Sequence, residues 1–409
     1  MITYIVWGHF MKLFQRLLVA PAALGLISPI AANATEINLN EISNYSDVES
    51  IELANSFDSD QPNKSLLLAG GEGLADTDSY DGGFSETTTA SFSVDFGIGA
   101  VDGKDVTSTV TDGDETLQAS YGFQIDLSTS FTGEDSLDIS LDAGNANGSL
   151  SEFDFNGPAS ITSTSSVSDA LTVDGISYTF PVGEATVFVG DNTDGSMLFT
   201  TACAYGGPSN TLDDCANVTA GITGGGIAVG AAYDFGNGFT SAVGAQFSET
   251  GIATKGNDDS YALNLAYTTD NYGVSVTYAM VEDSSGSTDD DDNFTALNAY
   301  YSFDNGLNIS AGYETGDLDN AAANADETEA YFFGVNGEVG PGELGAAIGT
   351  YGKMAEASGV MPERMMYEAY YSYPVNDGMT ITPLIYTVEG ENAADEDETG
   401  VMVKTSFSF

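Results

Sequence analysis

The feature that most constrains the fold is an alternation of apolar and polar residues along short segments. It is clearest over residues 117–128, where Leu117, Ala119, Tyr121, Phe123, Ile125 and Leu127 alternate with Gln118, Ser120, Gly122, Gln124, Asp126 and Ser128. A period of two places the two kinds of residue on opposite faces of an extended strand. One apolar face opposite one small, polar face is typical of a strand in a transmembrane barrel. The pattern begins near Phe84 and continues to the C-terminus.

The connections between these segments are of two kinds. Seven are tight turn sequences, and they are Gly133-Glu134, Gly183-Glu184, Gly236-Asn237-Gly238, Asp270-Asn271, Asp304-Asn305-Gly306, Gly340-Pro341-Gly342 and Asn376-Asp377-Gly378. Eight are longer and rich in Asp, Ser, Asn and Gly, and they lie near 101–115, 145–170, 192–222, 249–259, 283–292, 315–327, 353–365 and 390–397. Short and long connections alternate throughout, as short periplasmic turns and long external loops do.

The segments between the connections predict about sixteen strands. These are 84–100, 116–131, 136–144, 171–182, 185–191, 223–235, 239–248, 260–269, 272–282, 293–303, 307–314, 328–339, 343–352, 366–375, 379–389 and 398–409. An even number places both ends of the sheet on the periplasmic side. Closure would remove every sheet edge, which the hydrocarbon core requires, and about sixteen strands would leave an aqueous lumen. We therefore expect an all-β protein, a closed antiparallel transmembrane β-barrel over residues 84–409.

The first 83 residues do not follow this pattern. Lys12 and Arg16 precede an apolar stretch that ends near Ala32-Asn33-Ala34, which predicts a signal peptide over 1–34 with Met11 as its start. Residues 35–83 are polar and weakly periodic, so we interpret them as a periplasmic linker or a short plug.

Composition excludes several classes of function. The only His, His9, falls within the expected signal peptide, so the exported chain has no imidazole for nucleophilic catalysis or metal binding. The formal net charge is −54, with 62 acidic and eight basic residues, which argues against nucleic acid or anionic lipid as a partner. The 22 Phe and 21 Tyr residues argue against a disordered acidic chain. We expect no enzyme activity, no cofactor and no metal site.

A pair of cysteines and a run of aspartates outside the predicted strands bear on function. Cys203 and Cys215 lie in one long loop of an exported chain, which predicts a disulfide worth about 3 kcal/mol in the chain-entropy model. The run Asp289 to Asp292 lacks the spaced ligands and the Gly and Glu positions of a calcium loop. Diffuse screening by divalent ions is the favoured interpretation of that run.

Alternation also predicts which side chains face the lumen. The polar members are Asp95, Gln124, Asp126, Asp138, Asp142 and Glu368, and Lys404 is the clearest basic residue among them. Aromatic residues gather near the short turns, either as a membrane-interface girdle or as ordinary sheet core. They are Phe131, Phe180, Phe235, Phe239, Tyr267, Tyr272, Phe303, Tyr373 and Phe407.

Four segments resemble a known family. The leader 11–26 and the blocks 122–127, 178–183 and 203–210 are similar to the major outer-membrane porins of marine cyanobacteria, which are grouped with carbohydrate-selective (OprB-type) porins. The resemblance implies a homotrimer in outer-membrane lipid, inserted by the barrel assembly machinery, that passes small hydrophilic solutes, including sugars. The family usually carries an S-layer homology domain before the barrel. Segment 35–83 is too short for it, which puts peptidoglycan anchoring in doubt.

The resemblance also implies roles for particular residues. An aromatic C-terminal strand, here ending Phe407-Ser408-Phe409, serves such barrels as an assembly signal. Their third long loop commonly folds into the lumen, in which case Asp191, Asp194, Asp213 and Asp214 line a constriction together with Lys404. The alternative is a solvated loop above the membrane. With this acidity the expected function is a passive channel that prefers cations. The rival is a structural surface protein or adhesin, built as a β-sandwich or solenoid.

Overall fold

The computed structural model describes residues 88–102, 117–145, 150, 152, 170–224, 226–249, 251–252, 259–283, 290–319, 327–355, 363–390 and 396–409. The expected signal peptide 1–34, the segment 35–83 and Asp289 lie outside these residues. The chain divides into Met1–Glu86 and Thr87–Phe409, and the fold below is that of the second unit.

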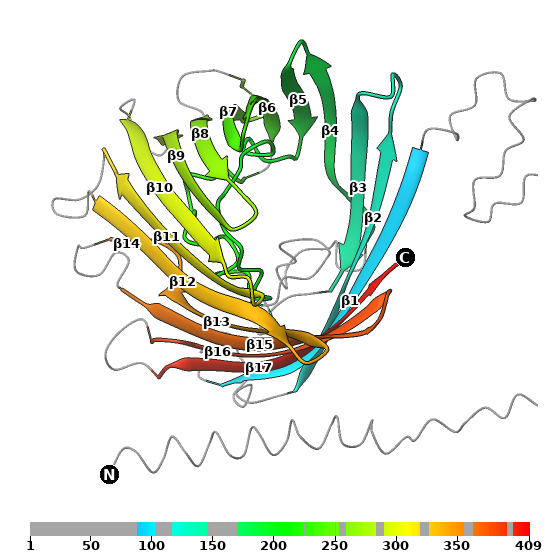
Figure 1. The fold of residues 1–409 in the computed structure, drawn as a ribbon, viewed down its shortest axis with the longest axis vertical. Coiled ribbons are helices and arrows are strands. Elements are labelled where there is room, and N and C mark those ends of the chain that lie inside the picture. The colour runs from blue at the N-terminus through cyan, green and yellow to red at the C-terminus, as the bar shows by residue number, and fades with distance from the viewer. Residues whose placement is uncertain are drawn as a thin grey trace, which may run out of the picture. The chain divides into compact units, whose positions relative to one another are not determined.

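Seventeen strands form one antiparallel sheet that closes on itself (Figure 1). They are β1 (Thr88–Asp102), β2 (Gln118–Thr129), β3 (Ser136–Gly144), β4 (Thr172–Val182), β5 (Ala185–Asp191), β6 (Ile227–Gly236), β7 (Phe239–Phe247), β8 (Ser260–Thr268), β9 (Tyr272–Asp283), β10 (Asp290–Ser302), β11 (Leu307–Asp317), β12 (Glu327–Val339), β13 (Gly342–Thr350), β14 (Met354–Ala355), β15 (Met365–Asn376), β16 (Met379–Val388) and β17 (Glu398–Ser408).

Sixteen of these strands make the barrel, and β14 is a two-residue extension. Met354 and Ala355 pair with Glu329 and Thr328 of β12, while β13 pairs directly with β15. The closed antiparallel barrel predicted from the sequence is therefore confirmed. None of the described residues forms a helix long and apolar enough to cross a membrane.

The barrel closes where β1 meets β17. Asp95 pairs with Ser406 and Gly97 with Lys404 in this seam. At its end, the amide of Phe92 donates to the carbonyl of Phe409 at 3.0 Å, and the amide of Phe409 donates back at 3.1 Å. The two rings stack with centroids 5.6 Å apart. Phe409 thus adds two hydrogen bonds and a ring contact to the seam that closes the barrel.

The tight turns have the geometry that their residues favour. Asn237 and Gly238 have φ angles of 54° and 87° and connect β6 to β7, as a two-residue hairpin loop with positive φ at both positions requires. In the turn from β2 to β3, Oδ1 of Asp135 accepts hydrogen bonds from the amides of Phe131 and Thr132 at 3.0 and 2.7 Å. Oδ2 of Asp135 accepts one from Tyr178 at 2.7 Å, which ties the turn to β4.

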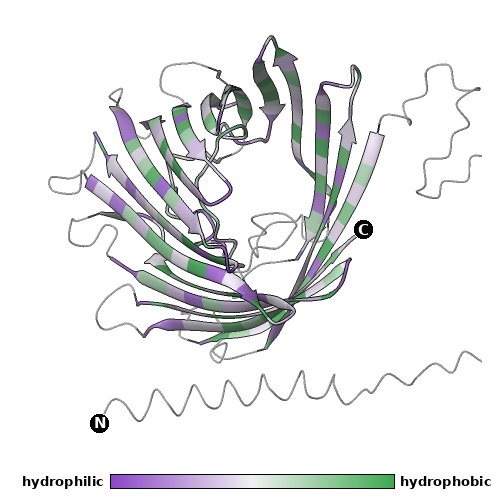
Figure 2. Ribbon diagram, in the orientation of Figure 1, coloured by the Kyte–Doolittle hydropathy of each residue, from purple (hydrophilic) through white to green (hydrophobic). Residues whose placement is uncertain are grey.

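The two faces of the wall differ as the alternation predicts, and Figure 2 shows hydrophobic and hydrophilic bands alternating along the strands. In β1, Phe96 is 52% exposed on the outside while its neighbour Asp95 is 1% exposed on the inside. Near the short turns, outer aromatic rings contact one another. The pairs are Phe131–Tyr178, Tyr178–Phe180, Tyr233–Phe235, Phe239–Tyr267, Tyr267–Tyr272 and Tyr301–Phe303. Contacts between rings on the outer wall are the arrangement that a membrane-interface girdle requires.

Candidate functional site: the lumen and its inner loop

The connection from β5 to β6, residues 192–224, lies inside the barrel and is called the inner loop (Figure 1, green). Its first arm runs along the inward faces of β8, β9 and β11. The amide of Thr200 donates to Oδ1 of Asn264 at 3.0 Å. The amides of Ala202 and Ala204 donate to the hydroxyls of Ser275 and Ser310, both at 2.9 Å. Inward-facing polar side chains therefore satisfy the backbone amides of this arm of the loop.

The second arm returns across neighbouring strands. Asn298 of β10 donates from Nδ2 to the carbonyl of Cys215 at 2.7 Å. Glu314 of β11 accepts from the amides of Thr219 and Ala220, both at 2.8 Å. A disulfide between Cys203 and Cys215 joins the two arms, with Cα atoms 6.4 Å apart.

Glycines on the inner face of the barrel let the backbone of the inner loop pack closely against β7 and β11. A Cβ at Gly312 would lie 1.7 Å from the carbonyl oxygen of Cys215, and a Cβ at Gly244 would lie 1.9 Å from that of Gly195. Any other residue at these positions would push the loop away from β11 or β7. The fit also requires unusual backbone in the loop, because Cys215 and Ala216 have φ angles of 54° and 59°. Such angles cost about 1–3 kcal/mol each and are kept only where surrounding contacts impose them.

The far end of the loop, residues 205–212, packs against β12, β13 and β15 and is called the tip. The ring of Tyr205 lies 5.2 Å from that of Phe332 and 5.9 Å from that of Tyr370. Its hydroxyl donates to Oε1 of Glu368 at 2.5 Å. Leu212, 1% exposed, is buried near Gly349 of β13.

Across the lumen from the tip, a polar cavity of about 870 Å³ lies between the inner loop and strands β3 and β4. Four carboxylates line it, from Asp138, Asp142, Asp174 and Asp194, together with uncharged polar groups such as Thr172 and Asn192. No Lys or Arg is among the lining residues that the structure describes. The hydroxyl of Thr172 donates to Oδ1 of Asp142 at 2.6 Å. Hydrogen bonding holds this carboxylate in place beside the cavity.

Beside the cavity, two further predicted lumen residues join the same network. Asp126 accepts hydrogen bonds from Ser140 at 2.7 Å and from Nε2 of Gln124 at 3.0 Å. The structure thus brings five of the predicted residues into one region of β2–β4 and the inner loop. They are Gln124, Asp126, Asp138, Asp142 and Asp194.

The other residues predicted to line the lumen or its constriction lie outside the acidic cavity. Asp191 ends β5 on the same face as Val189, which is 45% exposed on the outer wall, so it does not line the cavity. Asp213 is exposed and Asp214 half-buried on a turn at the end of the tip. Burial raises the pKa of Asp214 to about 6, although the amide of Ala216 donates to its carboxylate.

Lys404, Asp95 and Glu368 point inward but also lie outside the cavity. Lys404 lies opposite Gly97 of β1 and Thr382 of β16, diagonal to the buried Asp95. Glu368 is 5% exposed because Tyr205 covers it. Its carboxylate contacts the tip through the hydroxyl of Tyr205.

Three important residues were not predicted. Asp174 lies at a β-bulge in β4, where the register against β3 shifts at Ser140 and Leu141, so strict alternation does not give its direction. Glu152 comes from the long segment 145–170, which carries no periodic signal. Glu314 shares the polar face of 307–314 with Asn308 and Ser310, so the alternation of that strand could have identified it.

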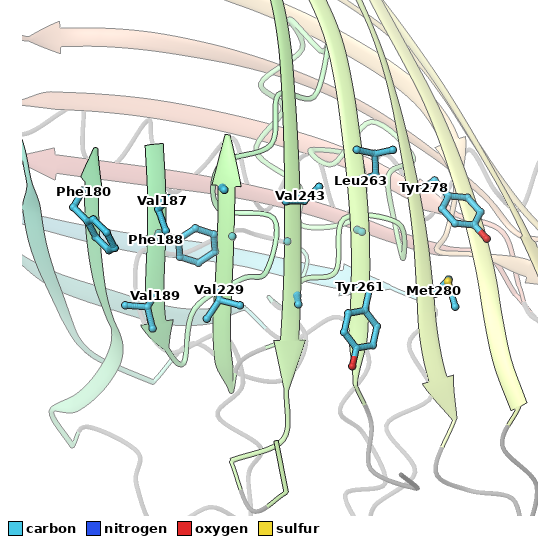
Figure 3. A pocket seen from close by; sticks show the side chains of 15 residues that line it. Phe180, Val187, Phe188, Val189, Val229, Val243, Tyr261, Leu263, Tyr278 and Met280 are labelled. Atoms are coloured by element: carbon cyan, nitrogen blue, oxygen red, sulfur yellow. The ribbon is translucent and has the colours of Figure 1, made fainter. Parts of the chain in front are cut away.

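The outer wall carries a hollow of its own, of about 710 Å³, over β4–β9 (Figure 3). Val189, Val229 and Val243 line it on three neighbouring strands, with Gly230 and Gly244 between them. Among the residues that the structure describes, no group of three or more His, Cys, Asp or Glu side chains could hold a metal ion.

No family model and no curated protein matches the sequence. Solved structures with a similar fold do match the structure of this chain. The anion-selective porin from Comamonas acidovorans is 16% identical with a TM-score of 0.57, over 79% of this chain and 99% of that one. OprB of Pseudomonas putida is 13% identical with a TM-score of 0.57, over 79% and 94%. The chain has a porin fold. A mutant of the Rh. blastica porin adds a third likeness, at 13% identity and a TM-score of 0.51, over 79% and 100%.

Proposed function

We propose that this protein is a passive outer-membrane channel for small hydrophilic solutes and ions, and that it prefers cations. The observation that carries the proposal is the cavity beside the inner loop, whose described lining contains four carboxylates and no basic side chain. The inner loop occupies the side of the lumen formed by β7–β15, so the open passage runs along β3 and β4. Among the residues that the structure describes, every charged group that lines the cavity on that side is negative.

The physical reason for cation preference is the local field. Carboxylates on a narrow, low-dielectric wall raise the local concentration of cations and repel anions, and salt screens them less than it screens an exposed mouth. The Comamonas acidovorans porin is described as anion-selective. Selectivity depends on the side chains in the lumen and not on the barrel, so an opposite preference is compatible with a shared fold.

Neutral solutes are the second part of the proposal. Thr172, Ser177, Asn192 and Thr193 add uncharged hydrogen-bonding groups to the cavity wall. Such groups replace water around sugar hydroxyls, and the resemblance to carbohydrate-selective porins implies sugar passage. The exported chain has no His, which favours a channel over an enzyme. We propose that it works without a cofactor.

We further propose a homotrimer that contacts outer-membrane lipid on the rest of its wall, after insertion by the barrel assembly machinery. The seven residues of β5 span about 23 Å when extended and less than about 20 Å when tilted as barrel strands are. This is shorter than an apolar band of about 25 Å. A neighbouring copy against β4–β9 would fill the hollow and cover the part of the barrel where β5 is too short to span the apolar band.

The test is recording in planar bilayers with a variant in which Asp142, Asp174 and Asp194 are all changed to Asn. We expect discrete ion-conducting steps for the wild type, and a several-fold lower preference for K⁺ over Cl⁻ in the variant. Asp191→Asn is the matched control, because Asp191 is exposed on the outer wall. Sugar entry is measured by swelling of loaded liposomes. Absence of conductance and of swelling in correctly folded protein would refute the proposal.

A further inference from the structure

The tip of the inner loop is held at the side of the lumen opposite the open passage. Tyr205 and Leu212 pack on β12, β13 and β15, whereas the acidic cavity is lined by β3 and β4. In the closed order of strands these two groups lie on opposite sides of the barrel. The position of the tip therefore sets how much of the lumen remains free.

One side-chain pair fixes this position from the wall. The hydroxyl of Tyr205 donates to Oε1 of Glu368 at 2.5 Å, and both residues are 5% exposed. A hydrogen bond to a carboxylate shielded from water is stronger than one between neutral groups. Gly334 makes room for the pair, because a Cβ there would lie 2.7 Å from Cδ2 of Tyr205.

A second carboxylate holds the tip from the direction of the external loops. Glu152 accepts from the hydroxyl of Thr211 at 2.9 Å, and its carbonyl accepts from the amide of Asn210 at 2.9 Å. The hydroxyl of Tyr351 donates to the same carboxylate at 2.9 Å. Glu152 thus links the tip to the β13–β14 connection, at a different point from Glu368.

We propose that Tyr205 and Glu368 are a positioning pair that clamps the inner loop against β12–β15 and keeps the passage open. This proposal rests on the channel function proposed above. When the bond is lost, the tip moves into the lumen and narrows it intermittently. Neither residue lines the passage, so the pair acts through the loop and not on the solute.

The test compares Tyr205→Phe with Tyr386→Phe. Tyr205→Phe keeps the ring contacts and removes only the hydroxyl. Tyr386 lies in the same buried cluster as Tyr205, and its hydroxyl donates to Glu398 of β17 at 2.9 Å, so its variant removes a similarly buried bond that involves no residue of the inner loop. We expect Tyr205→Phe to show frequent partial closures in single-channel records, and the control to show steady current. Glu368→Ala should behave as Tyr205→Phe does, and Glu368→Gln, which keeps an acceptor, should restore steady current.

Hydrogen exchange gives a readout that does not depend on conduction. The amides of Ala202 and Ala204 bond to the wall just before Tyr205, and their exchange should be about tenfold faster in Tyr205→Phe than in Tyr386→Phe. Steady current and unchanged exchange in both Tyr205→Phe and Glu368→Ala would overturn the proposal. If the wild type does not conduct, the channel function fails, while the exchange experiment still decides whether the clamp exists.

Discussion

At the scale of single residues, the carboxyl of Asp214 in the inner loop is expected to change its charge just below neutral pH. It is half-buried near the end of the tip, and burial raises its pKa to about 6. The amide of Ala216 donates to it at 2.8 Å, which favours the charged form but does not offset the burial. Asp214 is therefore negative at neutral pH and becomes neutral under mildly acidic conditions.

The prediction at this scale follows from the loss of this negative charge on acidification. Cation preference should fall modestly as pH is lowered from 7 to 5, because Asp214, which lies on the inner loop but outside the acidic cavity, loses its charge as pH passes through about 6. Asp214→Asn should start with a lower preference at pH 7 and lose less of it on acidification. Reversal potentials at the two pH values measure both effects. An identical pH dependence in wild type and variant would contradict the role of Asp214.

Single residues also show what sequence reasoning could reach. The inward direction of Asp138 and Asp142 followed from alternation, because both lie in a regular strand paired in register with β2. Asp174 could not be placed in this way, because a bulge in β4 changes the register at that point. The pairing of Tyr205 with Glu368 joins residues 163 positions apart, and no local pattern connects them.

At the scale of elements, the inner loop depends on glycines that have no side chain to displace it. Gly312→Ala would place a Cβ 1.7 Å from the carbonyl oxygen of Cys215, so the second arm must move away from β11. We expect changed conductance and faster exchange of the amides of Thr219 and Ala220. Gly206→Ala is the control in the same loop, since its Cβ would meet nothing within 4 Å. Equal behaviour of the two variants would show that the loop does not depend on this contact.

The disulfide gives a second prediction for this element. Cys203 and Cys215 join two arms that are each hydrogen-bonded to the wall. Reduction should therefore increase current noise without unfolding the barrel. Alkylation before and after reduction, read by mass spectrometry, reports the state of both thiols. Two free thiols in unreduced protein would contradict the pairing.

Elements differed in how far the sequence could predict them. The strands and tight turns followed from local residues, because alternation and turn-forming residues act over only a few positions. Asn237-Gly238 is one example, since its two positive φ angles are what that dipeptide favours. The path of the inner loop did not follow, because it is set by wall residues such as Asn264 and Ser310 that lie far away in the sequence.

At the scale of the whole molecule, Phe409 extends the seam between β1 and β17, which ten residue pairs close. Phe409 forms two backbone hydrogen bonds and a stacked ring contact with Phe92. Deleting it should lower the free energy of unfolding by about 2 kcal/mol, from the sum of these contributions, and should reduce the yield of folded barrel. Phe409→Tyr should restore both. The fraction that migrates as folded barrel on unboiled gels measures the yield, and an unchanged yield after deletion would contradict this role.

The central claim concerns the charge of the whole lumen and is tested most directly by the reversal potential across a bilayer in a KCl gradient. The predicted potential has the sign of cation selectivity and is moderate near 0.15 M salt. It should grow on dilution, because the screening length rises from about 8 Å at that concentration to about 30 Å at 0.01 M. A potential that favours chloride, or one that stays at zero as the salt is diluted, would contradict the claim that the acidic cavity determines what passes.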